Sequence, residues 1–164
     1  MKIFSHAPQE YSCPICCAIQ GIDNEKVWIK KSDIFYQDDL VICFINSRAI
    51  KGNEHHVNVV PLVHFENIYD IPAEYLNRIN ELVQKVSFGL KELRKCDGVT
   101  IVQNNEPAGD QHAFHYHTHV IPRYVGDNFH EELWKPTRSE PENRAPFAEE
   151  MGNFLIQYGK IEKI

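Results

Sequence analysis

The pentapeptide HYHTH at residues 115–119 places three histidines at alternate positions. On a strand, His115, His117 and His119 would project from one face, about 7 Å apart along the chain. The alternative without function is a polar strand that faces solvent. Histidine is uncommon, however, and three histidines on one strand face require an explanation. Two kinds of chemistry fit. Imidazoles at i and i+2 can bind one metal ion, and a neutral imidazole is a good nucleophile at phosphorus near neutral pH.

A second group of reactive side chains lies near the N-terminus, where Cys13 and Cys16 form a Cys-x-x-Cys pair. This spacing alone is compatible with a redox motif, half of a zinc site or chance, and Cys17 directly follows the pair. Buried apolar thiols are the alternative without chemistry. The pair therefore needs partners from elsewhere in the chain before it predicts a metal site.

The elements that must position these residues follow from the hydrophobic pattern. Strands are expected where β-branched and aromatic residues are dense, over residues 27–46, 55–61, 98–105 and 114–122. The segment 72–95 is the clearest helix, because apolar residues recur at steps of three or four and Pro72 suits a first turn. A short helix is expected over about 146–158. The fold class is therefore α+β, with a mostly antiparallel sheet of about five strands, one long helix and a C-terminal helical extension.

Composition and charge limit the class of protein. The chain has 164 residues, of which 43% are hydrophobic and 24% are charged, and its formal net charge is −6. This balance weighs against general binding to nucleic acid or to anionic membranes. The longest strongly apolar run, residues 40–45, is far shorter than the roughly 20 residues that span a bilayer. The first residues carry no secretory signal, so a cytoplasmic location with reduced thiols is expected.

Two longer segments resemble the histidine triad (HIT) family. Residues 108–123, AGDQHAFHYHTHVIPR, are similar to its signature, in which alternating histidines follow a loop that carries glycine and glutamine. Residues 55–71 are similar to the strand and turn that precede this signature in the family. A lone His-x-His-x-His would be a weak signal, but these motifs in this order are specific. The resemblance covers about 13–127 of a single domain spanning 1–164, and 128–164 form a C-terminal extension.

The resemblance implies a nucleotide hydrolase that cleaves at the α-phosphorus of dinucleoside polyphosphates or nucleoside phosphoramidates and releases a nucleoside monophosphate. Family members form a covalent nucleotidyl intermediate on the middle histidine, here His117. His119 would contact the phosphate and the leaving group, and His56 would order the pocket, a role for which His55 competes. A nucleotidyltransferase or phosphorylase would share the first half-reaction. A non-catalytic nucleotide-binding protein is an alternative of a different class.

The resemblance also implies contacts to a substrate, expected to be a purine nucleotide. The candidate substrate-binding residues are Asn46, Gln103, Asn104, Gly109, Gln111 and His112. Gln111 matches a glutamine that contacts the phosphate. The sequence departs from the family pattern at His112, where Ser or Thr is usual, and at Asp110, which is inserted after Gly109. Asn46 stands where many members carry a ribose-binding aspartate; an asparagine can still hydrogen-bond a ribose, and it is equally compatible with an ordinary turn.

Zinc-bearing branches of this superfamily pair a Cys-x-x-Cys with two histidines, which here are His64 and His115. The resemblance thus implies that Cys13, Cys16, His64 and His115 form a closed tetrahedral shell around a structural zinc. A zinc redox switch through the two cysteines is an alternative.

A homodimer is implied as well, because the family commonly pairs its long helices and a central strand across a twofold axis. Ile79, Val83 and Phe88 cannot share one narrow stripe of the predicted helix, so a second buried face is expected unless Phe88 packs within the monomer. In the tail, Trp134 and Arg138 are candidates for contacts to substrate or to the second subunit.

Overall fold

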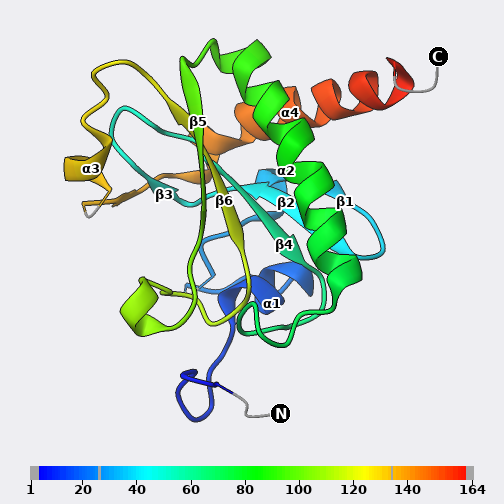
Figure 1. Cartoon of the computed structure of the whole chain (residues 1–164), viewed down its shortest axis with the longest axis vertical. Coiled ribbons are helices and arrows are strands. Elements are labelled where there is room, and N and C mark those ends of the chain that lie inside the picture. The colour runs from blue at the N-terminus through cyan, green and yellow to red at the C-terminus, as the bar shows by residue number, and fades with distance from the viewer. Residues whose placement is uncertain (1–3, 26, 134, 162–164) are drawn as a thin grey trace.

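The computed structural model describes residues 4–25, 27–133 and 135–161. A five-stranded antiparallel sheet forms the centre of the fold and has the strand order β1-β2-β4-β6-β5 (Figure 1). Its strands are β1 (Ile34–Gln37), β2 (Val41–Ile45), β4 (Val57–Pro61), β5 (Gly98–Gln103) and β6 (Thr118–Arg123). A separate two-stranded sheet pairs β3 (Arg48–Ala49) with β7 (Thr137–Arg138).

Helices cover the sheet and the segments between its strands. In the described part of the chain these are α1 (Pro14–Ile19), α2 (Ala73–Arg94), α3 (Phe129–Glu132) and α4 (Pro141–Ile161), with short 3-10 turns η1 (Lys31–Asp33) and η2 (Pro107–Gly109). Figure 1 shows α2 running along one face of the sheet. This architecture confirms the predicted α+β class. Within the described ranges, no helix is both long enough and apolar enough to cross a bilayer.

Helix α2 matches the segment predicted over residues 72–95. Its buried residues recur at steps of three or four and pack on alternate residues of β2 and β4: Ile79, Leu82, Val83, Val86 and Leu90. Burial of each such side chain contributes about 1.5–3 kcal/mol to folding. The helix ends at Arg94 and is capped by Lys95, whose φ of 50° is the left-handed conformation common at helix C-termini.

Phe88 lies off this stripe and packs within the subunit. Its ring centroid lies 5.8 Å from that of Phe154 and 5.3 Å from that of Tyr158, both on α4. The neighbouring Gly89 lets the two helices approach closely, because a Cβ there would lie 2.7 Å from Met151 Sδ. The position of Phe88 therefore does not require a second subunit.

Helix α4 is longer than the segment predicted over residues 146–158, because it begins at Pro141. Pro146, the expected first residue, lies inside the helix. A buried ion pair anchors the first turn instead: Arg144 donates to both carboxylate oxygens of Asp33, at 2.9 Å and 2.7 Å. Both side chains are almost fully buried, so this contact between distant parts of the chain decides where the helix starts.

The strand expected over residues 114–122 begins only at Thr118, which corrects the prediction for the first two histidines of the triad. The backbone groups that would continue the ladder have other partners. The carbonyl of Pro61 bonds to the ring Nε2 of His115 at 3.0 Å, and the amide of Tyr116 donates to Phe65 at 2.6 Å. The chain before Thr118 is therefore irregular, and His115 is free to face a different site from His119.

The two faces of the sheet carry different kinds of residue. On β2, β4 and β6, residues such as Cys43, Val59 and Val120 face α2 and form the main core. The alternate positions on the opposite face include Phe44, Asn58, His119 and Ile121, and the segment that contains α1 packs over part of this face. The candidate site is built on this second face.

Candidate active site and metal centre

A cavity of about 570 Å³ opens on the sheet face opposite α2. It combines an apolar wall with a group of histidine and asparagine side chains, as ligand pockets commonly do. Its lining includes Pro14, Ile15, Trp28, Ile29, Phe44, Asn46, Ser47, Arg48, Ile50, His56, Asn58, Val102, Asn104, Asp110, His112, Ala113, His117, His119, Ile121, Leu133 and Pro136.

Three imidazoles meet in this cavity. The ring centroids of His117 and His119 lie 4.8 Å apart, and those of His56 and His119 lie 5.3 Å apart. Nδ1 of His117 lies 2.6 Å from the backbone carbonyl oxygen of His115. Because a carbonyl can only accept a hydrogen bond, Nδ1 carries the proton and Nε2 keeps its lone pair. This arrangement leaves His117 with an unprotonated nitrogen beside His119.

Burial keeps these imidazoles neutral. It lowers the pKa of His56 to about 3, and the nearby His117 and His55 add to this effect. Burial also lowers the pKa of His117 and that of His119, which lies close to His117 and His56. The Nδ1 atoms of His56 and His119 are buried without a hydrogen-bond partner among the described residues, a cost that a polar ligand would remove. Of the two neighbouring histidines, His56 lines the cavity, whereas His55 stacks on Phe147, with a distance of 3.9 Å between the ring centroids.

Two asparagines line the cavity near the histidines. Asn46 donates through Nδ2 to Asn58 Oδ1 at 2.9 Å, and its Oδ1 accepts from the backbone amide of Arg48 at 2.7 Å. Asn58 lies directly opposite His119 in the pairing of β4 with β6. The sequence interpretation missed Asn58, although it is the one amide in the apolar strand VNVVP, a signal that could have identified it.

Gln111 is placed differently from the expected phosphate contact. Its Nε2 donates to the backbone carbonyl of Glu66 at 2.5 Å, and its Oε1 accepts from the amide of Glu106 at 2.7 Å. The side chain is 3% exposed and is not among the residues that line the cavity. Gln111 therefore ties together the two loops at this end of the sheet.

The remaining loop candidates divide into two groups. Asn104 and His112 line the cavity, and Asn104 donates to the carbonyl of Asp110 at 3.2 Å. Gln103 instead exchanges hydrogen bonds with Asn105, and neither it nor Gly109 lines the cavity. Asp110 lines it and has a φ of 65°, the left-handed conformation that favours glycine, so this departure from the family pattern bears backbone strain.

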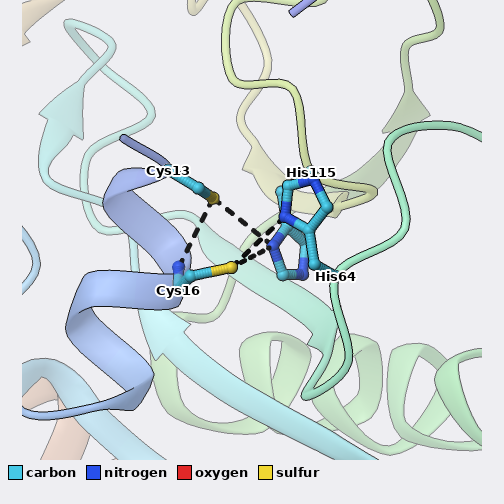
Figure 2. Close-up of side chains that lie close together, drawn as sticks. All are labelled: Cys13, Cys16, His64 and His115. Carbon is cyan, nitrogen blue, oxygen red and sulfur yellow. Dashed lines mark hydrogen bonds between the residues drawn. The ribbon is translucent and has the colours of Figure 1, made fainter. Parts of the chain in front are cut away.

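The four predicted metal ligands lie together. Cys13 and Cys16 extend from the start of α1, His64 from the loop after β4 and His115 from the segment before β6, and their side chains converge (Figure 2). Cys16 Sγ lies 3.2 Å from Nδ1 of His64 and 3.4 Å from Nδ1 of His115. Cys13 Sγ lies 3.5 Å from the same nitrogen of His115. The ligand atoms all lie within 4.8 Å of one another.

These distances fit a tetrahedral zinc ion. Bonds of about 2.3 Å to sulfur and about 2.1 Å to nitrogen separate neighbouring ligand atoms by about 3.5 Å. Nε2 of His115 is hydrogen-bonded to the carbonyl of Pro61, which leaves Nδ1 unprotonated and able to bind a metal. Burial, together with the adjacent Cys13, raises the pKa of Cys16 to about 12. A thiolate there thus needs a bound cation to balance its charge.

The C-terminal extension contributes to the cavity wall through Leu133 and Pro136. Arg138, in β7, lies beside this wall, and its guanidinium carbon is 5.1 Å from the ring centroid of Trp28. Trp134, the other tail candidate, lies outside the described residues. The sequence interpretation missed Trp28 and Arg48, because no motif marks either residue.

Comparison with known proteins agrees with this geometry. The model of the HIT domain family matches residues 29–126, more than half of the chain. The chain belongs to the HIT, or histidine triad, family. The protein "Protein hit" of Bacillus subtilis is 33% identical to it over 127 residues, which cover 76% of this chain and 79% of that protein.

Solved structures share the fold over most of the chain. A zinc-bound histidine triad family protein from Mycobacterium smegmatis superposes with a TM-score of 0.71 at 24% identity, covering 92% of this chain and 97% of that one. The diadenosine triphosphate hydrolase of Plasmodium falciparum superposes with a TM-score of 0.68 at 19% identity, covering 79% and 80% of the two chains. A protein with this fold is thus a hydrolase of a dinucleoside polyphosphate.

Proposed function

We propose that this HIT protein hydrolyses nucleotides at the α-phosphorus and releases a nucleoside monophosphate. The expected substrates are dinucleoside polyphosphates or nucleoside phosphoramidates, with a purine base. The observation that carries the proposal is the hydrogen bond of 2.6 Å from His117 Nδ1 to the His115 carbonyl, which leaves Nε2 as a nucleophile beside His119.

In the proposed reaction, the base occupies the apolar part of the cavity and the ribose lies against Asn46 and Asn58. Nε2 of His117 attacks the α-phosphorus, a P–N bond to the enzyme forms, and the bond to the leaving group breaks. Water then attacks the same phosphorus, releases the monophosphate and regenerates His117. His119 contacts the phosphate and the leaving-group side.

The surroundings of His117 support this role. Burial lowers the pKa of its imidazole, so the ring is neutral and nucleophilic at neutral pH. His112 lines the same cavity, and its imidazole would donate to the phosphoryl oxygens as negative charge develops on them. Gln111 supports the reaction indirectly, because its hydrogen bonds hold the loop that carries His112. A hydrolase of diadenosine triphosphate with the same fold agrees with this reaction class.

The direct test is to trap the covalent intermediate. The protein is mixed with a fluorogenic adenosine phosphoramidate or with a diadenosine polyphosphate, quenched in acid-free denaturant and digested. Mass spectrometry should then find a nucleoside monophosphate adduct on the peptide that contains His117. An adduct on another residue would refute the mechanism, and an intact substrate would favour a non-catalytic nucleotide-binding protein. Product identification with added inorganic phosphate separates hydrolysis from phosphorolysis and nucleotidyl transfer.

We also propose that Cys13, Cys16, His64 and His115 hold a structural zinc. Four protein ligands leave no open position, so the metal would supply folding energy and take no part in the reaction. It would tie α1 to the segment that ends in His117. Metal analysis of protein purified without added zinc should give about one zinc per chain. A redox switch would instead show thiol reactivity that rises as the metal is lost.

A homodimer is the proposed assembly. Strand β5 is at one edge of the main sheet, and its Ile101 side chain is 56% exposed, so this edge can pair with a second copy. Sedimentation at micromolar concentration should give about twice the chain mass of 19.1 kDa. A species of single-chain mass would refute the pairing.

A further inference from the structure

Two arginines are directly paired across the small sheet beside the cavity. In the small sheet of β3 and β7, Arg48 is the direct pairing partner of Arg138. Side chains at directly opposed positions of an antiparallel pair project on the same side, with Cβ atoms about 5 Å apart. Two like charges in this relation repel each other, and an anion bound between them would relieve the repulsion.

Trp28 lies against both guanidinium groups. The guanidinium carbon is 6.0 Å from the indole centroid for Arg48 and 5.1 Å for Arg138. Cation–π contact orients these planar groups without cancelling their charge. Trp28 and Arg48 both line the cavity, as do Leu133 and Pro136 just before β7. Arg48 is therefore part of the cavity wall, and Arg138 lies beside it through their shared contact with Trp28.

The charges of this pair are poorly balanced within the subunit. Arg78, Arg123 and Arg144 each lie 2.7 Å from an aspartate oxygen. Arg138, by contrast, has only the exposed Glu140 at 3.8 Å, and the described residues place no carboxylate within ion-pair distance of Arg48. In a chain with net charge −6, an unbalanced pair of arginines beside the cavity is a local exception.

The arginine pair is close to the candidate chemistry. The backbone amide of Arg48 donates to Asn46 Oδ1, and Asn46 belongs to the proposed ribose contacts. After burial and the neighbouring imidazoles, the charge of Arg48 also contributes to lowering the pKa of His119. A guanidinium presents paired N–H donors that match phosphate oxygens.

We propose that Arg48 and Arg138 bind a second phosphate group of the nucleotide, beyond the one that reacts at His117. The C-terminal extension, which carries Arg138, then completes the substrate site and selects nucleotides with two phosphates over those with one. This inference rests on the proposed function for its ligand class, a nucleotide, but not on hydrolysis. The second phosphate is either the next one along the leaving group or a phosphate on the ribose.

Binding measurements test the proposal without turnover. Calorimetry compares AMP with a methylene-bridged ADP and with adenosine 3′,5′-bisphosphate. In the wild-type protein at least one bisphosphate should bind about tenfold or more tightly than AMP, because hydrogen bonds to charged groups contribute that much. Preference for the ADP analogue identifies the leaving-group phosphate, and preference for the 3′,5′-bisphosphate identifies the ribose phosphate.

Variants assign the preference to the arginines. The ratio of the affinity for the preferred two-phosphate ligand to the affinity for AMP should fall close to one in Arg48→Gln and in Arg138→Gln. Arg48→Lys should keep part of this ratio, because the charge remains without the paired donors. Lys51→Gln removes an exposed charge three positions after Arg48 and should leave the ratio unchanged. Thermal melting establishes that each variant is folded.

The outcomes separate the two proposals. Equal affinity for AMP and both bisphosphates, or a ratio that survives both Arg→Gln substitutions, overturns the arginine site and leaves the hydrolase proposal standing. A ratio that depends on the arginines in a protein that turns over no nucleotide supports the site and overturns only the hydrolase proposal.

Discussion

The protein contains two clusters of histidines, one with His115 and the other with His117, which differ in their partners and in their access to solvent. In the cysteine cluster, Nδ1 atoms of His64 and His115 point at sulfur atoms 3.2–3.5 Å away, and the shell is closed. In the cavity, His117 and His119 lie edge to face at 4.8 Å and border an open volume of about 570 Å³. His115 and His117 thus have different surroundings within one short segment: sulfur atoms of the cysteine pair in one case and an open cavity in the other.

The cysteine cluster should have the larger effect on stability. Cys13→Ser removes one of four ligands, and since much of the binding energy of a structural zinc is folding energy, we expect zinc to be lost and Tm to fall by roughly 10 °C or more. Differential scanning calorimetry with metal analysis checks this. Cys17→Ser is the matched control, since that thiol lies beside Ser12 and outside the cluster. If the wild-type protein kept its full Tm in the presence of a metal chelator, the result would contradict a structural role of the cysteine cluster.

The cavity cluster should have the larger effect on activity. His117→Ala should lower kcat by roughly a thousandfold or more, as loss of a covalent nucleophile commonly does. The zinc content and Tm of the His117→Ala variant should stay close to those of the wild type, because His117 is not one of the four proposed zinc ligands. Steady-state kinetics and metal analysis on the same preparation measure both. His130→Ala, an exposed histidine outside both clusters, should leave activity unchanged. Normal turnover by His117→Ala would contradict the assignment.

Asn46 and Asn58 test the proposed ribose contact beside the histidines of the cavity. Asn58→Ala removes the acceptor for Asn46 Nδ2, so the proposed ribose contact loses its support. We expect KM to rise by roughly tenfold, about 1.4 kcal/mol, with a smaller change in kcat. Asn153→Ala on the exposed side of α4 serves as the control. A loss confined to kcat would place Asn58 with the reacting groups instead.

His55, next to the cavity cluster but outside it, should have the smallest effect. Burial against Phe147 lowers its pKa to about 4, whereas the unfolded chain takes up the proton near the ordinary value of about 6.5. Between these values the unfolded state binds more protons, so this contribution to stability is complete above about pH 6.5 and is lost as the pH falls toward about 4.

The corresponding variant is His55→Asn, which tolerates the positive φ of this position. Urea unfolding at several pH values, at equal zinc content, should show a shallower pH dependence for this variant than for the wild type. His130→Asn should keep the wild-type slope. Identical slopes in all three proteins would show that His55 does not contribute to the acid sensitivity.

Local patterns in the sequence predicted much of the fold. The helix over residues 72–95 and the strands around β2, β4 and β5 followed from apolar periodicity, which depends on neighbours a few positions apart. Helix α4 was predicted too short, since its start depends on the ion pair between Arg144 and Asp33, residues that no local pattern connects. The strand of the triad was predicted too long for a similar reason. The carbonyl of Pro61 accepts from the ring of His115, and the amide of Tyr116 donates to the carbonyl of Phe65, so neither backbone group extends the strand pairing.

By itself, the sequence identified the residues of both candidate sites, since alternating histidines and a Cys-x-x-Cys are unusual at any position. Only the tertiary structure decided how they divide into a closed cluster and an open cavity. The tertiary structure also placed Gln111 where its side chain hydrogen-bonds the backbone of two loops. It paired Arg48 with Arg138 across β3 and β7. The physical reason is that directions of side chains and pairings between distant strands arise from long-range packing and hydrogen bonds, which leave no periodic trace in the chain.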